Sequence, residues 1–444
     1  MLRIYPEIEF SAKCPKDGAA LNIKNVVIPG MRCLVNVTCP TCANNYYIDL
    51  PVGQGLWSPI VLNQATAEIC DPLEMTWFSG PLQEGFTHRV TSEIVPIVHK
   101  FFDAERIVIV NCLDFLYGHA LLKLLNVQRH LKNSPQLGCC VLVPTQLVHL
   151  VPDGVAEIWE FPIAIKEGWK WYVSLERWID KQLIQRQECF LSPAYSHPSN
   201  QDYDLHCFVR NLPDISDRIE TKQPIILFSY REERLWGRNL AAQQRNIQKL
   251  YHQLSLLFPD MVFVLVGFGH KNRISQTKAE IIDLRADKFD LERDRLWMAY
   301  MSMADCVIGV HGSNMLLPSG LAKSTVELVP RSRIANTVQD FLFSPNKTDL
   351  RDALLFYRLL YGNESLSSIQ PSEVTNMVES VLLYSPINSN WFKVDNSQTA
   401  LSSLHSAYQK FLEQKAKTSL QLSSSQALLK QKIKQTIRII TTAK

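Results

Sequence analysis

The chain has 444 residues, 46% of them hydrophobic and 20% charged, a composition typical of globular proteins that excludes wholesale disorder. The length suggests about two or three domains, and no apolar run approaches the roughly 20 residues of a membrane span. The N-terminus carries Pro6, Glu7 and Glu9 where a signal peptide would have its apolar core, so we expect a cytoplasmic protein.

The formal net charge of +3 is unevenly distributed, because residues 400–444 contain eight Lys or Arg and only one acidic residue. The rest of the chain is therefore mildly acidic. A nucleic-acid-binding face needs a concentrated basic patch, so we expect no nucleic-acid partner.

The first 50 residues contain four cysteines, namely Cys14, Cys33, Cys39 and Cys42. The turn Cys39-Pro-Thr-Cys42 resembles half of a zinc site, and the matching turn, Cys14-Pro-Lys-Asp17, has Asp17 where a second cysteine would stand. Either Asp17 or Cys33 could complete a tetrahedral site. Alternating runs predict strands at 23–27, 34–37 and 46–50. We expect a zinc-ribbon-like module over residues 1–50 with a structural Zn; the alternative is a ribbon that has lost its metal.

From residue 106 onward, short apolar strands alternate with helices, a pattern typical of a parallel sheet covered on both faces. The first group has strands at 106–111, 138–143 and 155–161 and a helix at 117–131. Residues 192–222 are rich in Pro, Asn, Ser and Asp and are predicted to form an interdomain linker.

The second group follows the linker. Its strands are predicted at 224–230, 261–267, 281–284, 305–310 and 324–329, and its helices at 239–258, 291–303 and 313–322. The prediction is thus an α/β protein with two Rossmann-like domains, 51–210 and 223–365, and a helical tail at 366–444. In such sheets the ligand binds at the carboxyl ends of the strands.

The strand at 224–230 leads directly into a loop with three arginines, Arg231, Arg234 and Arg238. Guanidinium groups match phosphate oxygens, and a helix N-terminus near Asn239 would add positive charge, so the loop predicts an anion site. The alternative is a solvated loop in which the arginines pair with Glu232 and Glu233.

The strand at 261–267 ends in Gly267-Phe-Gly269, which permits a ligand to approach the backbone closely. The segment is not a full GxGxxG fingerprint with a following acidic residue, so an ordinary dehydrogenase is disfavoured. A tight turn explains the two glycines equally well.

The most specific motif follows the strand at 305–310 and reads His311-Gly312-Ser313-Asn314. Ser313 or Asn314 is expected to cap the next helix, and the imidazole, hydroxyl and amide together suit a phosphate or a leaving-group oxyanion. Glu327, in the next strand, is expected to accept hydrogen bonds from ribose hydroxyls. The alternative for His311 is a structural histidine.

The run GVHGSN followed by an apolar helix and VELVP resembles the C-terminal signature of glycosyltransferase family 61. The resemblance extends over residues 106–335 and is strong over 305–330. It implies a GT-B fold of two Rossmann-like domains and a nucleotide-sugar donor bound by the C-terminal one. The donor-site residues that we predict are Arg231, Arg234, Arg238, Gly267, Gly269, Gly312, Ser313, Asn314 and Glu327, and His311 would assist the leaving group.

Tyr117-Gly118-His119 resembles an aromatic-His motif in the N-terminal half of the same family. An inverting transferase needs a base for the acceptor hydroxyl, and an imidazole has a suitable reference pKa of about 6.5. We predict His119 as this base, with Asp114 as alternative or orienting partner; otherwise His119 only packs at the helix start. No isolated DxD pair lies at a suitable strand end, so we expect no catalytic metal.

The basic tail contains four apolar residues on one helical face, Leu429, Ile433, Ile437 and Ile440. Such a helix either packs on the protein or contacts an anionic membrane surface peripherally.

The sequence therefore predicts a glycosyltransferase that moves a sugar from a nucleotide diphosphate to a hydroxyl of a saccharide acceptor. Two alternatives remain. One is an enzyme like the polysaccharide pyruvyl transferases, which would use phosphoenolpyruvate. The other is a degenerate transferase that serves as a non-catalytic scaffold.

Overall fold

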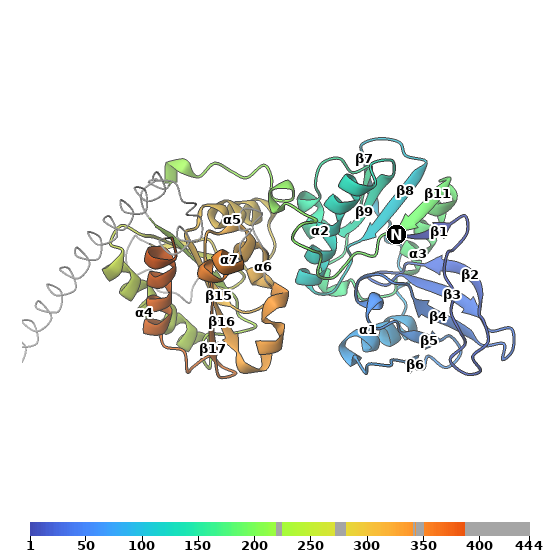
Figure 1. Ribbon diagram of the computed structural model, residues 1–444, viewed down its shortest axis with the longest axis horizontal. Helices are drawn as coiled ribbons and strands as arrows, with labels where there is room; N and C mark the ends of the chain where they lie inside the picture. The colour runs from blue at the N-terminus through green and yellow to red at the C-terminus, as the bar shows by residue number, and fades with distance from the viewer. Residues whose placement is uncertain (219–223, 271–280, 341, 343–349, 387–444) are drawn as a thin grey trace, which may run out of the picture. The chain divides into compact units, whose positions relative to one another are not determined.

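The computed structural model describes residues 1–218, 224–270, 281–340, 342 and 350–386 (Figure 1). The chain divides into two compact units, the first covering Met1–Arg210 and the second beginning at Asn211. Both units are mixed α/β structures with parallel sheets. None of the described helices combines the length and the apolar composition needed to cross a membrane.

The main sheet of the first unit has the strand order β1-β11-β8-β9-β10-β7. Its four inner strands are parallel, and β1 and β7 pair antiparallel at the two edges. The strands are β1 (Leu2–Tyr5), β7 (Ile97–Lys100), β8 (Arg106–Asn111), β9 (Gly138–Pro144), β10 (Glu157–Phe161) and β11 (Glu188–Leu191). The strands β8, β9 and β10 therefore follow one another across the sheet. The chain then returns to the other side of β8, where β11 pairs with it.

Alternation along β8 directs its side chains to two different cores. Helix α2 (Tyr117–Asn133) contacts β8 and β9 on one face of the sheet. On the other face, Ile107 and Ile109 share a core with a second, antiparallel sheet and with α3 (Val173–Ile184). The unit is therefore layered around β8 and β9, whose residues are almost all fully buried.

The second sheet of this unit has the order β2-β3-β4-β5-β6 and is antiparallel throughout. Its strands are β2 (Asn22–Val27), β3 (Leu34–Thr38), β4 (Asn45–Asp49), β5 (Val61–Asn63) and β6 (Ile69–Cys70). The three strands predicted in the first 50 residues are confirmed, and the sheet continues beyond them to Cys70. Helix α1 (Thr76–Thr87) follows.

The second unit is built on a six-stranded sheet with the order β14-β13-β12-β15-β16-β17, and all its neighbouring strands are parallel. The strands are β12 (Ile225–Tyr230), β13 (Val262–Gly267), β14 (Ile281–Asp283), β15 (Cys306–Val310), β16 (Thr325–Pro330) and β17 (Tyr357–Gly362). Numbered from β12, the order is that of a doubly wound nucleotide-binding sheet, with its switch point between β12 and β15.

Helices cover both faces of this sheet. Helix α4 (Leu240–Leu257) packs with α8 (Pro371–Glu379) over a core that includes Phe228 and Leu265, and α5 (Leu291–Met303) contacts β12 and β13. Two short helices, α6 (Leu316–Leu321) and α7 (Leu350–Phe356), complete the described part.

Residues 192–210 are not a free linker, because they belong to the first unit. Leu205 and Phe208 are buried in it, and the amide of Gln128 on α2 donates to Cys207 Sγ. The low content of regular structure in this segment thus reflects irregular packing. The tail positions Leu429, Ile433, Ile437 and Ile440 lie outside the described residues.

Candidate functional site

Two predicted motifs meet at the switch point of the second unit. The arginine loop follows β12, the His-Gly-Ser-Asn turn follows β15, and these two strands are direct neighbours in the sheet. Crevices at this place in doubly wound sheets bind ligands. The geometry of the two loops therefore decides what the unit can bind.

Two guanidinium groups hold the two loops together. Arg231 Nη1 donates to Asn314 Oδ1 at 2.7 Å, and Arg234 Nη1 donates to the backbone carbonyl of His311 at 2.8 Å. Asn314 Nδ2 in turn donates to Ser229 Oγ, the last polar side chain of β12 before Tyr230, at 3.0 Å. The strand ends are thus linked by side chains that also carry positive charge.

Gly312 lies directly beneath both arginines. Its φ of +146° is one that L side chains rarely adopt, and an added Cβ would lie 2.5 Å from Arg231 Nη1 and 2.8 Å from Arg234 Nη1. The φ value therefore favours glycine here, and any larger residue would also require the two flexible guanidinium ends to move. Arg231 Nε also lies 3.6 Å from Glu233 Oε2, so part of the arginine–glutamate pairing that the alternative expected is present.

Neither Ser313 nor Asn314 caps a helix, contrary to the prediction. The residues at the cap positions are Gly312 and Met315, without a side-chain cap bond at either one. The Asn314 side chain instead bonds the end of β12 and Arg231. Asn314 therefore shapes the arginine pair.

His311 belongs to a buried polar chain at the end of β15. Its Nδ1 lies 2.9 Å from Glu327 Oε1, and the two side chains are 2% and 0% exposed. Tyr357 OH, at the start of β17, donates to the other oxygen of Glu327. Both carboxylate oxygens of Glu327 are used inside the unit, so Glu327 orients His311 and is not placed to meet a ribose. The ribose-binding role predicted for Glu327 stays a prediction that these internal contacts do not favour.

The arginine loop is fixed to the start of α4. Gln243 Nε2 donates to the carbonyl of Arg231 at 2.9 Å, and Gln243 Oε1 accepts from the backbone N–H of Trp236 at 2.8 Å. The Trp236 indole is fully buried and donates to the carbonyl of Ile369. Asn239 caps α4 through its side chain, as the predicted helix start requires. The loop is therefore held in place from several directions.

Gly267 and Gly269 have a packing reason of their own. An added Cβ would lie 2.2 Å from the carbonyl oxygen of Tyr230 at Gly267, and 2.3 Å from the Tyr230 ring at Gly269. The loop after β13 also bonds Glu232, because His270 places its backbone N–H and its Nδ1 at 3.1 and 3.0 Å from that carboxylate. Burial raises the pKa of Glu232, but these hydrogen bonds lower it more, so the net shift is downward. The two glycines allow β13 to pack closely against β12.

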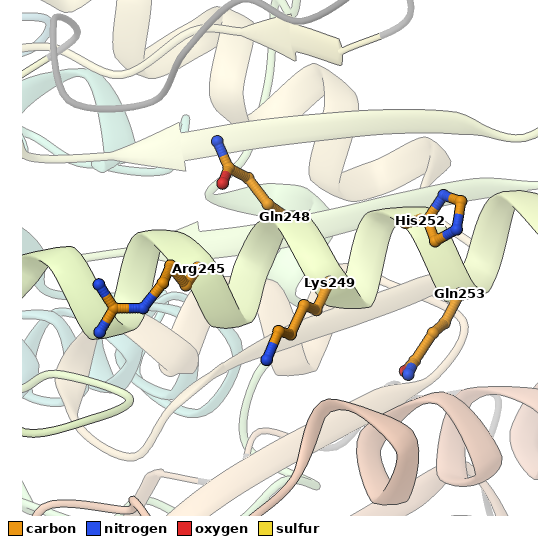
Figure 2. A pocket seen from close by; sticks show the side chains of 5 residues that line it. All are labelled: Arg245, Gln248, Lys249, His252 and Gln253. Carbon is orange, nitrogen blue, oxygen red and sulfur yellow. The ribbon is translucent and has the colours of Figure 1, made fainter. Parts of the chain in front are cut away.

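Arg238 faces a different part of the surface from Arg231 and Arg234. It lines a cavity of about 240 Å³ together with Asn239, Ser367 and Gln370. A second cavity, of about 330 Å³, is formed along one side of α4 by Arg245, Gln248, Lys249, His252 and Gln253 (Figure 2). Arg231, Arg234 and the His-Gly-Ser-Asn turn line neither of these cavities.

The first unit has its own polar cluster after β8. Asp114 is 3% exposed, and Lys123 Nζ on α2 donates to Asp114 Oδ2 at 2.8 Å and to the carbonyl of Leu113 at 2.9 Å. Burial raises the pKa of Asp114, but the Lys123 ammonium and His119 lower it more, so the pKa lies well below its usual range. An acid this strong is a poor base at neutral pH.

His119 lies beside this carboxylate at the start of α2. Its Nδ1 is 3.6 Å from Asp114 Oδ1, beyond a good hydrogen bond, and its ring centroid is 5.8 Å from that of Trp77. The His119 side chain is 20% exposed, and Trp77 is 46% exposed. Of the two predicted bases, His119 thus has the accessible side chain, and Asp114 is placed to orient it.

The cysteine turns bring together Cys14, Asp17, Cys39 and Cys42, whose ligand atoms all lie within 4.8 Å of one another. This cluster could hold a metal ion. Cys33 is not among its members within the described residues. Cys33 lies directly before β3, where it is buried and its Sγ accepts a hydrogen bond from Asn111 Nδ2 at 3.4 Å. Of the two candidates for the fourth ligand, the structure therefore brings only Asp17 to the other three.

Sequence reasoning missed four residues of these sites: Lys123, Trp77, Ser229 and Tyr357. Lys123 had a signal, because it interrupts the apolar run Leu121–Leu125 of a helix that must pack on a sheet. Ser229 also had one, as the polar residue in an otherwise apolar strand. Tyr357 had none, since β17 was not predicted.

No family model matches the chain, and no curated protein matches it, so the resemblance to family 61 stays a prediction. Among solved structures, it is similar to E. coli ADP-heptose lps heptosyltransferase II, at 14% identity and a TM-score of 0.38, over 62% of this chain and 98% of that one. It is similar to the E. coli heptosyltransferase WaaC with ADP, at 12% identity and a TM-score of 0.40, over 62% and 99%. It is also similar to a family 9 glycosyl transferase from Veillonella parvula DSM 2008, at 14% identity and a TM-score of 0.41, over 64% and 99%.

Proposed function

We infer that the protein is a glycosyltransferase of the GT-B type that moves a sugar from a nucleotide diphosphate to a hydroxyl of a saccharide acceptor. The observation that carries this proposal is the approach of Arg231 and Arg234 to Gly312, at the switch point of a doubly wound sheet. Guanidinium groups bind the oxygens of a diphosphate in a charge-assisted, bidentate manner, which supports this assignment.

The chemistry of the transfer explains why such a pair is useful. As the bond between the anomeric carbon and the diphosphate breaks, negative charge grows on the leaving oxygen. Fixed guanidinium groups stabilise that charge more than they stabilise the intact donor, so they lower the barrier. Expected metal independence follows from the same assignment, since the arginines would take the place of a divalent cation. His311, whose Nδ1 is held by Glu327, keeps its predicted role of assisting the leaving group.

Transfer with inversion also needs a base for the acceptor hydroxyl. We assign this role to His119 of the first unit, with Asp114 as the residue that orients it. The adjacent exposed Trp77 offers an apolar ring face against which a sugar ring can pack. The resemblance to family 61 supports the same division, with the donor in the second unit and the acceptor in the first.

The test is a thermal-shift panel of the full chain with UDP, GDP, CMP, dTDP, ADP and phosphoenolpyruvate. A ligand at 100 times its dissociation constant stabilises the native state by about 2.7 kcal/mol, which gives a readable shift in Tm. We expect one nucleoside diphosphate to stand out. A response to phosphoenolpyruvate alone would instead favour the pyruvyl-transferase alternative, and no response at all would favour the scaffold.

A further inference from the structure

We propose that Cys14, Asp17, Cys39 and Cys42 form a structural zinc site that joins the N-terminal arm to the β3–β4 turn. The four ligand atoms lie within 4.8 Å of one another. Cys14 Sγ and Cys42 Sγ are 3.7 Å apart, and Cys39 Sγ is 3.4 Å from Asp17 Oδ2. Zn–S bonds of about 2.3 Å in a tetrahedron place two sulfurs roughly 3.8 Å apart. A zinc ion would therefore need only small movements of these side chains.

The two turns that supply the ligands have the same backbone hydrogen bonds. In the first, Cys14 N donates to the carbonyl of Ala19 at 2.8 Å, and Gly18 N donates to the carbonyl of Cys14 at 2.9 Å. The corresponding bonds of the second turn, at residues 39–44, span the same numbers of residues. The likeness is thus one of main-chain geometry as well as of the Cys-Pro sequence.

In the second turn, Cys39 N donates to the carbonyl of Asn44 at 2.9 Å, and Ala43 N donates to the carbonyl of Cys39 at 3.1 Å. Ala43 has a φ of +58°, the left-handed conformation that Gly18 adopts in the first turn with +75°. An alanine adopts this conformation at a cost of about 1 kcal/mol or more. The two turns thus share this hydrogen-bond pattern residue by residue, and Asp17 holds the position that Cys42 holds in its own turn.

The surroundings favour a metal over a disulfide. Three thiols and one carboxylate converge, whereas a disulfide would use only two of the thiols. Cys14 and Cys39 are 3% and 1% exposed, and the backbone N–H of Cys42 points at Cys39 Sγ from 3.4 Å. Amide donors of this kind stabilise a thiolate ligand. On binding, the zinc ion would displace one proton from each of the three thiols, with Asp17 already ionised.

The site would link the segment before β2 to the turn between β3 and β4, which lies more than 20 residues later in the chain. Residues 14–17 precede β2, and residues 39–42 connect β3 to β4. A shared ion ties these turns together, so zinc stabilises the folded sheet over the unfolded chain. This role is independent of the proposed transfer reaction, because it concerns a different part of the chain.

The experiment measures metal by plasma mass spectrometry in the purified full chain, its Asp17→Cys, Asp17→Ala and Cys39→Ser variants, and the control Cys33→Ser. We expect one zinc per chain in the parent, in Asp17→Cys and in Cys33→Ser, and a zinc affinity at least about tenfold weaker in Asp17→Ala. Cys39→Ser should lose the ion. Cobalt supplied in place of zinc should give the visible spectrum of a tetrahedral thiolate site, and Asp17→Cys should shift it toward four sulfurs.

Three results would overturn the proposal. One is a parent protein that holds no zinc as purified and takes up none from added zinc. Another is stoichiometric iron in place of zinc. The third is zinc loss in Cys33→Ser together with full retention in Asp17→Ala. Asp17→Cys guards against misreading a variant that fails to fold, since it adds a stronger ligand and should bind zinc at least as well as the parent.

Discussion

At the scale of single residues, Gly312 sets the geometry of the proposed donor site. Two guanidinium groups approach its backbone, and its φ of +146° lies in a region that favours glycine. A methyl group there would strain the backbone and shift both Nη1 atoms from their present positions.

We expect Gly312→Ala to weaken nucleoside diphosphate binding by at least about tenfold and to destabilise the second unit by about 1–3 kcal/mol. Isothermal titration calorimetry and thermal unfolding measure these two effects. Gly80→Ala is the control, because nothing lies within 4 Å of an added Cβ at Gly80. Equal affinities in the two variants would show that the approach to Gly312 is unimportant for binding.

His119 is the second residue with a testable role. Replacement by alanine should lower the transfer rate about 10² to 10⁴-fold, the range typical for loss of a general base, and leave donor affinity unchanged. His88→Ala, an exposed histidine of the same unit, should transfer at the parent rate. Release of the nucleotide in the presence of acceptor reports the rate. A His119→Ala variant as fast as the parent would remove His119 from the mechanism.

At the scale of elements, most central strands and the edge strands β2 and β14 were predictable from the sequence, whereas β5 and β11 inside the sheets and the edge strands β1, β6, β7 and β17 were not. The strand at 106–111 and the helix at 291–303 have the bounds that the apolar pattern predicts, because central strands and their covering helices leave a strong hydrophobic signal. By contrast, β1 and β17 lie at sheet edges, where partial exposure weakens that signal. Contacts between elements far apart in the sequence, such as Glu327 with Tyr357, leave no local pattern at all.

The proposed metal ligands also show how little local sequence says about contacts between distant elements. Cys33 and Asp17 were equally good by residue type, and only the pairing of β3 with its neighbours carries Cys33 away from the other cysteines. The carboxyl ends of β12 and β15 could be predicted as a site because topology alone brings them together.

The contact between α2 and β11 should make the stability of the first unit depend on pH. His130 on α2 is 6% exposed, and its Nε2 lies 2.6 Å from Oγ of Ser192, the residue after β11. Burial lowers the pKa of His130 to about 4. The unfolded chain, with a pKa near 6.5, therefore binds more protons between these values, and stability must fall as the pH drops below about 6.5.

We expect the first unit to lose about 2 kcal/mol of stability from this histidine between pH 7 and pH 5. Denaturant unfolding at the two pH values measures the loss, and His130→Gln should reduce it. His206→Gln, on an exposed side chain of the same unit, is the control. An unchanged pH dependence in His130→Gln would contradict the assignment to His130.

At the scale of the whole molecule, the basic tail raises the question of a membrane partner. We propose that residues 422–444, whose sequence spaces apolar and basic residues as an amphipathic helix would, bind an anionic surface. The full chain should float with vesicles that contain anionic lipid, and a chain that ends at Gln421 should not. High salt should weaken the binding, since screening reduces attraction between lysines and lipid headgroups. Equal flotation of the two chains would contradict the proposal.

The two units divide the proposed reaction, with the diphosphate of the donor held by the second. The most direct test is calorimetric titration of the nucleoside diphosphate selected by the thermal-shift panel into the parent, Arg231→Met and Arg245→Met. Arg245 is the matched control, because it carries the same charge on α4 but lines the separate cavity of Figure 2. A lost charge-assisted hydrogen bond costs about 1.5–3 kcal/mol, so Arg231→Met should bind roughly 10- to 100-fold more weakly, while Arg245→Met binds like the parent. Unchanged affinity in Arg231→Met, or an equal loss in Arg245→Met, would contradict a diphosphate site at the ends of β12 and β15.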